Sequence, residues 1–318
     1  MPFVTGADAV PELSDAPLHP ALAQLQADQW AAGKRPPQAI GHEAARAGML
    51  ATALAAPAGD DLPRVEDLAA PGPEGDIPVR VYSPDDPRAT ILYLHGGGWV
   101  IGGLDEFDRV ARRLARVARA RVVSVDYRRA PEHVYPAAHD DAQAALDWVR
   151  TTCADLPIVV AGDSAGGNLA AYLALEARDA GEPLAGQVLA YPVTDHDPSR
   201  ASHLQFAKGT YRLTAAAMAW FWDRYVPDVA RRTEPRVAPL RARDLGGLAP
   251  AIVVVAGHDP LRDEVLAYAR ALAEAGTPVS VRAYPEMEHA FLSSIGVVED
   301  ASRVYEEIAA DLDVLLGG

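Results

Sequence analysis

A serine framed by two glycines is the residue of this chain with the clearest chemical potential. Residues 156–161 (LPIVVA) form a short apolar run that predicts a buried strand, and residues 168–177 (NLAAYLALEA) predict a helix. Between them, Gly162-Asp163-Ser164-Ala165-Gly166 has the Gly-x-Ser-x-Gly pattern, in which a sharp strand-to-helix turn lifts the serine out of the backbone. Side chains at the two glycine positions would crowd this turn. The pattern therefore predicts Ser164 as a nucleophile.

Three consecutive glycines follow a second predicted strand at residues 89–94 (ATILYL). The segment His95-Gly96-Gly97-Gly98-Trp99 leaves backbone N–H groups uncovered, as stabilisation of a tetrahedral oxyanion requires. A flexible loop and a phosphate-binding loop are the alternatives. A dinucleotide-binding fingerprint would need Gly-x-Gly-x-x-Gly at the start of a helix, whereas these glycines lead into an apolar Trp-Val-Ile run. The segment therefore favours an oxyanion-binding loop.

A serine nucleophile also needs a base that accepts its proton. In enzymes with this turn, the acid and then the histidine follow the serine along the chain. His289 lies after the predicted strand at residues 279–283, where the base is expected. The other downstream histidines fit less well, because His196 and His203 precede the last strands and His258 is directly next to an aspartate.

The acid that orients the base is predicted at the end of another strand. Asp259 stands at the carboxyl end of the predicted strand at residues 251–256. Asp263 is the alternative, but it falls in the first turn of the next helix with Glu264, where the helix dipole alone favours acidic residues. Glu286 and Glu288 lie too close to His289 in the sequence.

The composition is that of a globular protein and limits its partners. The 318 residues are 49% apolar and 23% charged, and the formal net charge is −15. This charge argues against nucleic acid or an anionic membrane as a partner. The single cysteine, Cys153, excludes an internal disulfide and suits a reducing compartment. No secretory signal and no apolar run of membrane-spanning length are apparent, so we expect a cytoplasmic protein.

From Asp76 onward, β-like and helical stretches alternate, which predicts an α/β fold with a mostly parallel sheet and helices on both faces. Two regions do not fit this alternation. Residues 1–48 predict helices interrupted by prolines. Residues 199–242 contain an aromatic-rich helix, with Thr214 as a plausible N-cap, that could either pack onto the sheet or form a lid over the strand ends. The strands are predicted at residues 77–82, 89–94, 121–126, 156–161, 186–191, 251–256 and 279–283.

Four motifs together resemble the bacterial hormone-sensitive-lipase-like esterases, a branch of the α/β-hydrolases. They are the glycine loop after His95, the turn around Ser164, the segment DPLRDE at residues 259–264 and the segment DYRRAPEH at residues 126–133. The resemblance implies an α/β-hydrolase catalytic domain at residues 49–318. It implies a helical cap, made of residues 1–48 and of an insertion at about residues 199–242.

The resemblance assigns roles to individual residues. It implies Ser164, Asp259 and His289 as the catalytic triad. The oxyanion hole would consist of the N–H groups of Gly97, Gly98 and Ala165. His95 and Asp163 would support the site by holding the glycine loop against the serine turn. Ala290 departs from the family pattern, which has a glycine after the catalytic histidine, and its methyl group could narrow the alcohol side of the pocket.

The implied function is a serine carboxylesterase for short- to medium-chain acyl esters that needs no metal and no organic cofactor. An amidase, a lactonase or a carbamate hydrolase could use the same triad. A non-catalytic binding protein, as among the plant gibberellin receptors, is disfavoured because such receptors have lost the histidine that this chain keeps at position 289. The resemblance also suggests a homodimer. Trp99, Phe206, Tyr211 and Leu213 are the residues expected to line the substrate pocket.

Overall fold

One eight-stranded sheet organises the part of the chain that the structure, a computed structural model, describes (residues 3–6, 10–153 and 155–317). The strand order is β1-β2-β4-β3-β5-β6-β7-β8. The pairs β1–β2 and β2–β4 are antiparallel, and the other pairs are parallel. The strands are β1 (Arg64–Ala70), β2 (Ile77–Ser83), β3 (Thr90–Leu94), β4 (Arg121–Val125), β5 (Ile158–Asp163), β6 (Gly186–Ala190), β7 (Ala251–His258) and β8 (Val279–Glu288).

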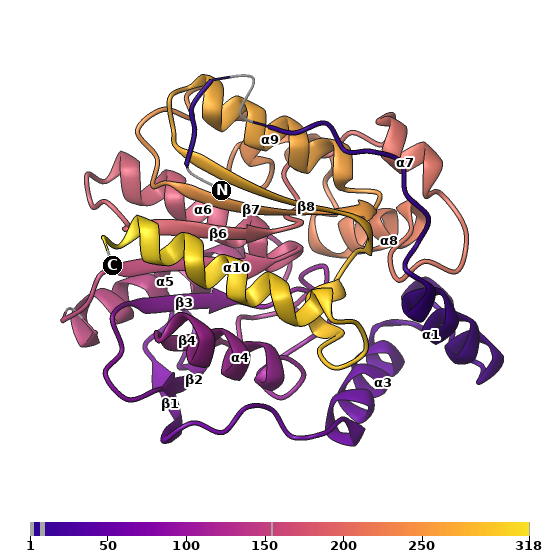
Figure 1. Ribbon diagram of the computed structural model, residues 1–318, viewed down its shortest axis with the longest axis horizontal. Helices are drawn as coiled ribbons and strands as arrows, with labels where there is room; N and C mark the ends of the chain where they lie inside the picture. The colour runs from indigo at the N-terminus through magenta and orange to yellow at the C-terminus, as the bar shows by residue number, and fades with distance from the viewer. Residues whose placement is uncertain (1–2, 7–9, 154, 318) are drawn as a thin grey trace.

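Helices cover both faces of this sheet (Figure 1), because its central strands are apolar on both faces. On β3, Ile91 and Tyr93 pack into one core with α4 and α10, while Leu92 and Leu94 point to the opposite face and pack into a second core with α5, α6 and α9. These helices are α4 (Asp108–Ala118), α5 (Ala137–Thr152), α6 (Ala165–Asp179), α9 (Arg262–Glu274) and α10 (Asp300–Leu315).

All seven predicted strands are present, with changes at their ends. β5 continues through Gly162, which the sequence suggested as its break, and β8 extends to Glu288, so that His289 follows the strand directly. The additional strand β1 was not predicted from the sequence. This strand reads RVEDLAA, lies at the edge of the sheet and is mostly exposed, so it lacks the apolar periodicity by which buried strands are recognised.

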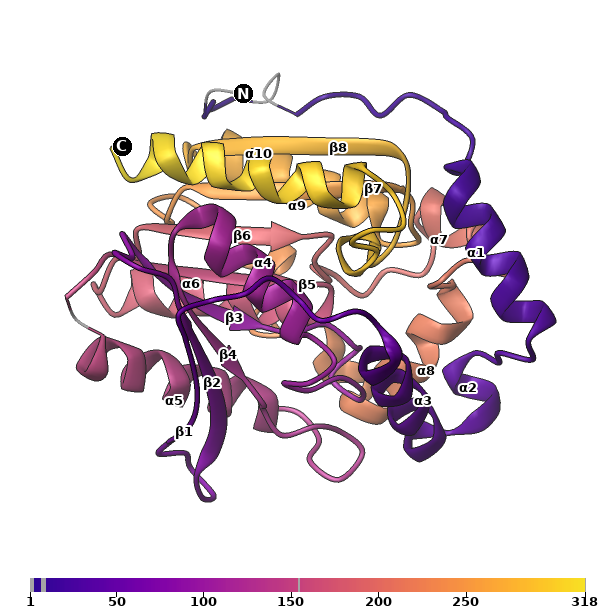
Figure 2. The ribbon, with the colours of Figure 1, turned by 60° about the horizontal axis from the view of Figure 1, so that its bottom comes forward.

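A separate group of helices lies beyond the carboxyl ends of the parallel strands, at one end of the molecule (Figure 2). Segments from both regions that broke the alternation meet there, since α2 contacts α8. The Thr214 hydroxyl accepts a hydrogen bond from the Ala217 N–H (3.2 Å) and so caps α8, as expected. The expected division at residue 48 falls inside α3, which continues to Ala55. The helices are α1 (Pro20–Ala31), α2 (Pro37–Ile40), α3 (His42–Ala55), α7 (Ala201–Gln205) and α8 (Ala215–Tyr225), with short 3-10 turns at η2 (Val229–Thr233), η3 (Pro239–Arg241) and η4 (Phe291–Ser293).

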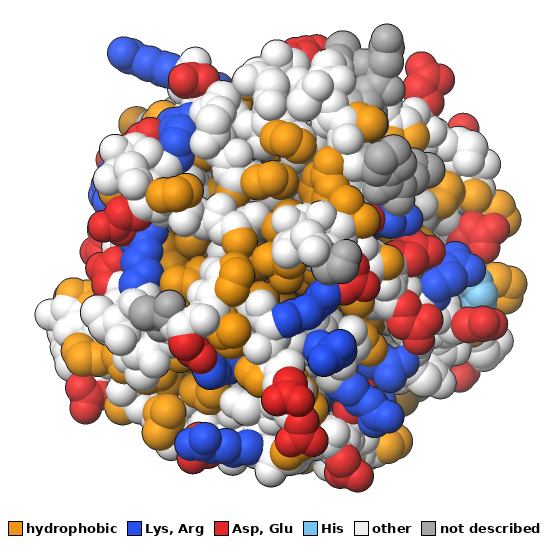
Figure 3. All heavy atoms as spheres, turned by 60° about the vertical axis from the view of Figure 1, so that its left-hand side comes forward, with side chains coloured by type: hydrophobic (Ala, Val, Ile, Leu, Met, Phe, Trp, Pro, Cys, Tyr) orange, Lys and Arg blue, Asp and Glu red, His pale blue; other side chains and the backbone are white. Residues whose placement is uncertain are grey.

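The side of the molecule away from α1, α7 and α8 is shown in Figure 3. Acidic, basic and hydrophobic side chains are interspersed on this face. Among the described residues, no helix combines the length and the apolarity that crossing a bilayer requires.

Candidate active site

Ser164 alone forms the turn between β5 and α6. Its backbone has φ 55° and ψ −119°, a region that residues other than glycine rarely occupy and that usually costs free energy. Two glycines allow the turn to pack closely against the neighbouring strand. A Cβ atom on Gly166 would overlap the carbonyl of Leu94, and one on Gly162 would overlap the backbone of Gly166. The glycine positions are therefore required by backbone packing at the end of β3.

Asp259, His289 and Ser164 form a continuous chain of hydrogen bonds. The Asp259 carboxylate lies 2.6 Å from Nδ1 of His289, and Nε2 of the same ring lies 2.9 Å from Oγ of Ser164. Asp259 is fully buried, and its second oxygen accepts a hydrogen bond from the Leu261 N–H (2.8 Å). The three residues follow β5, β7 and β8, so the sheet brings together side chains that are far apart in sequence. This arrangement can take a proton from the serine hydroxyl.

The glycine loop presents unpaired amide groups close to the serine turn. Gly97 and Gly98 have φ values of 117° and 59°, which glycine adopts without a steric penalty. Among the hydrogen bonds of the described residues, none uses the N–H of Gly97, Gly98 or Ala165. Ala165 is the first residue of α6, so its N–H has no acceptor within the helix. A ring from the group of helices covers the loop, because Phe221 of α8 fills the space that a Cβ atom on Gly98 would need.

Asp163 connects the glycine loop to the serine turn. Its carboxylate accepts hydrogen bonds from the Gly96 N–H (2.9 Å) and from the Tyr93 hydroxyl (2.6 Å). Burial raises the pKa of Asp163 to about 6, although both hydrogen bonds act in the opposite direction. The hydrogen bond to the Gly96 N–H is the contact that the expected supporting role of Asp163 requires.

His95 acts within its own loop. Nδ1 of its ring donates a hydrogen bond to the Gly96 carbonyl (2.7 Å), and the ring stacks on that of Tyr127 at a centroid distance of 4.3 Å. The Tyr127 hydroxyl in turn donates to the His95 carbonyl (2.7 Å). Burial lowers the pKa of His95 to about 3, so the ring stays neutral and keeps the loop in place by packing and hydrogen bonding.

Both neighbours of His289 are held by a residue that the sequence analysis missed. Arg212, in the loop before α8, donates from its backbone N–H to the Glu288 carboxylate (3.0 Å) and from its guanidinium to the Ala290 carbonyl (2.7 Å). Gln26 of α1 also donates to Glu288, which is fully buried. No local pattern marks these residues, and only the position of Glu288 next to His289 could have pointed to them.

The alternative acids and bases lie elsewhere. Asp263 accepts a hydrogen bond from the Ser202 N–H (2.7 Å), and Glu264 accepts one from the Thr194 N–H (2.8 Å). His203 is buried, with its Nε2 3.4 Å from the Glu264 carboxylate. His258 contacts the Ala16 carbonyl through Nε2 (2.9 Å). None of these contacts involves His289.

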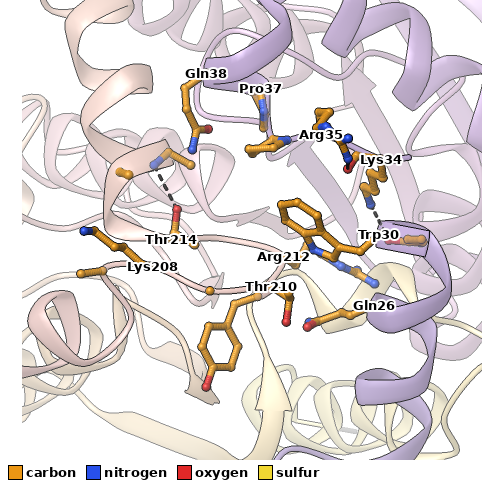
Figure 4. Close-up of a pocket in the computed structure, with 17 residues that line it drawn as sticks. Gln26, Trp30, Lys34, Arg35, Pro37, Gln38, Lys208, Thr210, Arg212 and Thr214 are labelled. Carbon is orange, nitrogen blue, oxygen red and sulfur yellow. Dashed lines mark hydrogen bonds between the residues drawn. The ribbon is translucent and has the colours of Figure 1, made fainter. Parts of the chain in front are cut away.

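Of the four expected pocket residues, Phe206 and Tyr211 are in ring contact, with a centroid distance of 5.1 Å. Trp99 is fully buried and stacks on Tyr225 at a centroid distance of 4.7 Å. Phe206 and Leu213 are also buried, whereas Tyr211 lines a cavity of about 240 Å³ between the α1–α2 segment and the loop before α8 (Figure 4). Two residues of the cavity wall bond the neighbours of His289: Arg212 donates to Glu288 and to the Ala290 carbonyl, and Gln26 donates to Glu288.

Comparisons with known proteins identify the family. Residues 91–293 match a family model described as alpha/beta hydrolase fold. The chain is 45% identical to the esterase LipI of Mycobacterium tuberculosis, over 80% of this chain and 83% of LipI. It is 38% identical to an ethyl acetate hydrolase of Pseudomonas putida, over 82% of this chain and 86% of the hydrolase.

A solved structure extends the similarity over nearly the whole chain. The ester hydrolase EH1AB1 from the metagenome of Lake Arreo, in complex with a derivative of bipyridine phosphonate, superimposes with a TM-score of 0.89 at 37% identity, over 95% of this chain and all of that chain. The chain therefore belongs to the hormone-sensitive-lipase-like branch of the α/β-hydrolases and is a carboxylic ester hydrolase.

Proposed function

We propose that the enzyme hydrolyses short- to medium-chain acyl esters through an acyl-enzyme, with Ser164, His289 and Asp259 as its triad. The observation that carries the proposal is the unbroken pair of hydrogen bonds of 2.6 and 2.9 Å that joins the three side chains. Similarity to the ethyl acetate hydrolase of Pseudomonas putida supports a short acyl group. The helices at the carboxyl ends of the strands would act as the cap.

The first half of the reaction forms the acyl-enzyme. Oγ of Ser164 attacks the ester carbonyl carbon and passes its proton to Nε2 of His289, while the Asp259 carboxylate stabilises the imidazolium. The N–H groups of Gly97, Gly98 and Ala165 stabilise the oxygen that becomes negative. When the tetrahedral intermediate collapses, the bond to the alcohol oxygen breaks and the imidazolium protonates the leaving alkoxide.

The second half regenerates the serine. A water molecule attacks the acyl carbon and loses a proton to His289. The bond between the acyl carbon and Oγ then breaks, Ser164 recovers the proton, and the carboxylic acid leaves.

The homodimer and the cytoplasmic location stay predictions from the sequence, and neither enters this mechanism.

Turnover of para-nitrophenyl esters from acetate to octanoate tests the proposal. The wild type should prefer the shorter acyl chains, and Ser164→Ala should lower kcat about 10⁴-fold or more. Ser124→Ala is the matched control, because Ser124 is a buried serine of β4 whose hydroxyl has no hydrogen-bond partner among the described residues. Undiminished turnover by Ser164→Ala, or a wild type inactive on every ester, would contradict the proposal.

A further inference from the structure

Both lysines of this chain line the same cavity. The chain has 29 basic residues, of which only Lys34 and Lys208 are lysines. Lys34 lies between α1 and α2, and Lys208 lies between α7 and α8. Both line the cavity of about 240 Å³, together with Arg35 and Arg212. None of the described aspartates and glutamates lines it, although the chain as a whole carries a formal net charge of −15.

Of the four cations of this cavity, Arg212 is paired with the Glu288 carboxylate (3.6 Å), whereas the other three have no carboxylate partner among the described residues. Within the part of the chain that the structure describes, Lys34, Arg35 and Lys208 form no ion pair. Lys34 donates a hydrogen bond to the Gln29 side chain (2.6 Å), and Arg35 donates one to the Lys34 carbonyl (3.3 Å). Lys208 has neither a hydrogen bond nor an ion pair with the described residues. The distribution differs from the face in Figure 3, where charges of both signs are interspersed.

Lys34 is the cation of this cavity that is best placed to bind an anion. Its ammonium group lies on the same side of the cavity as the Arg212 guanidinium (Figure 4). Desolvation and then the charge of Arg212 lower the pKa of Lys34. Two cations that repel each other in this way are both stabilised when an anion binds between them. The opposing carboxylate, Glu288, is already bound to Gln26 and Arg212.

Lys208 lies at the opposite rim of the cavity, with its ammonium group turned outward (Figure 4). Its side chain is exposed and free of partners, and a lysine stem has rotatable bonds that let the charge move. No hydrogen bond within the described residues must break for this ammonium group to turn toward a ligand. Lys208 is therefore a second, mobile cation for the same cavity.

The wall of the cavity is bonded to the backbone next to the proposed general base. Arg212, one of its walls, donates to the carbonyl of Ala290, the residue after His289. Trp30, Pro37 and Tyr211 provide an apolar wall for methylene groups. Pockets that enclose a whole drug-sized ligand measure roughly 300–1,000 Å³, so this cavity suits a fragment of a substrate.

We propose that this cavity is a subsite for an ionised carboxylate, so that the enzyme accepts esters that carry a second acid group. Lys34 is its principal cation and Lys208 its mobile one. The inference rests on the proposed ester hydrolysis and specifies its substrate class. The overall charge of the protein repels an anion, so a preference for acidic esters has to arise from these local cations.

Matched pairs of esters test the subsite by pH-stat titration of the full chain. In one arm, monoethyl esters of straight-chain dicarboxylic acids are compared with ethyl esters of monocarboxylic acids of equal length. In the other arm, acetyl esters of hydroxy acids are compared with acetyl esters of the corresponding alcohols. The first arm places the carboxylate on the acyl side and the second on the alcohol side. The measured quantity is the ratio of kcat/KM for the acidic ester to that for its neutral counterpart.

The wild type should favour the acidic ester in one of the two arms at low salt. Lys34→Gln should lower this ratio about two- to fivefold, the effect of losing one partly exposed ion pair. Lys34→Gln/Lys208→Gln should lower it further, and high salt should lower it in the wild type. Arg243→Gln is the control, because Arg243 is exposed and has no ion pair among the described residues.

Three outcomes would overturn the subsite. One is a wild type that favours the neutral ester in both arms while hydrolysing it normally. Another is an equal ratio in Lys34→Gln and Arg243→Gln. The third is an equal loss of both activities in Lys34→Gln, which would make Lys34 a structural counter-ion of Glu288. Failure of the proposed ester hydrolysis can be distinguished from failure of the subsite, because neutral esters would then not be hydrolysed at all.

Discussion

The guanidinium of Arg212 lies 3.6 Å from the Glu288 carboxylate, and the backbone N–H of Arg212 donates a hydrogen bond of 3.0 Å to the same group. Glu288 is fully buried and precedes His289. The same guanidinium reaches the Ala290 carbonyl on the other side of His289. The loop before α8 therefore holds the backbone of the proposed general base from both sides.

Loss of the Arg212 side chain should disturb both stability and catalysis. Arg212→Leu leaves the Glu288 carboxylate buried without its cation, which should lower the free energy of unfolding by about 3 kcal/mol. A loosened His289 should lower kcat for neutral esters about 10- to 100-fold with a smaller change in KM. Urea unfolding and steady-state kinetics measure the two effects.

A second substitution separates the buried charge from the lost packing. Arg212→Leu/Glu288→Gln should regain part of the lost stability, because a neutral amide costs less to bury than an unpaired carboxylate. If the double variant were less stable than Arg212→Leu alone, the ion pair would not be the cause.

Ala290 has the left-handed backbone conformation, with φ 60° and ψ 22°. This conformation costs about 1–2 kcal/mol for residues other than glycine, and a glycine loses somewhat more chain entropy on folding. Ala290→Gly should therefore raise the free energy of unfolding by about 0.5–1 kcal/mol, measured by urea titration. Ala310→Gly, at an exposed position of α10, should have the opposite sign and cost about 1 kcal/mol. A destabilised Ala290→Gly would show that no strain is stored there.

The contact between Gly98 and the ring of Phe221 predicts a coupling between the cap and the proposed oxyanion hole. A methyl group on Gly98 would overlap that ring, so Gly98→Ala should displace the loop and lower kcat about 100-fold or more. Gly98→Ala/Phe221→Ala should recover part of this loss, because the overlapping ring is gone. Double-mutant kinetics on a neutral ester measure the coupling.

Gly276→Ala controls for backbone strain. Gly276 has φ 85° and nothing within 4 Å of the added methyl group. The substitution should lower stability and leave kcat unchanged. If it lowered kcat as much as Gly98→Ala does, the effect at position 98 would not come from contact with Phe221.

His139 should make the fold sensitive to acid. Its ring contacts the Tyr225 hydroxyl (2.7 Å) and the Arg236 carbonyl (2.8 Å), and burial lowers the pKa of His139 to about 3. The contribution of the neutral buried ring to the free energy of unfolding is fully present above about pH 6.5, the ordinary pKa of a histidine in the unfolded chain. As the pH falls below that value the unfolded chain takes up a proton that the folded protein does not. Stability should then fall by about 1.4 kcal/mol per pH unit from this group, down to the folded pKa.

Urea unfolding between neutral and mildly acidic pH measures this dependence. His139→Gln should reduce the slope of stability against pH by about one proton, whatever packing it loses at neutral pH. An unchanged slope in His139→Gln would exclude the buried ring as a source of acid sensitivity.

Local features of the sequence were sufficient for much of the fold. The strands that lead into His95 and Ser164 are buried on both faces and appear as short apolar runs. The turn at Ser164 needs glycine at positions 162 and 166, so its pattern is visible within five residues. β1 was missed because a charged strand at the sheet edge buries little and has no apolar periodicity.

The three residues predicted as the triad are the ones joined by hydrogen bonds, and for the acid the sequence left Asp263 as an alternative to Asp259. Asp259 and Asp263 are four residues apart, and both follow β7. The structure directs Asp259 toward His289 and Asp263 toward Ser202. The expected pocket residues Trp99, Phe206 and Leu213 were chosen for their apolar character, and they are buried.

The α/β order of elements, the serine turn and the glycine loop could be predicted from local sequence, because each depends on backbone rules that act over a few residues. The contacts of Gln26 and Arg212 with Glu288 beside His289, and the cavity shared by Lys34 and Lys208, could not be predicted in this way and are known from the folded chain. These residues lie in separate segments whose positions depend on how the helices pack beyond the strand ends. Such packing produces no periodic pattern in the sequence, because its contacts join residues that are remote in sequence.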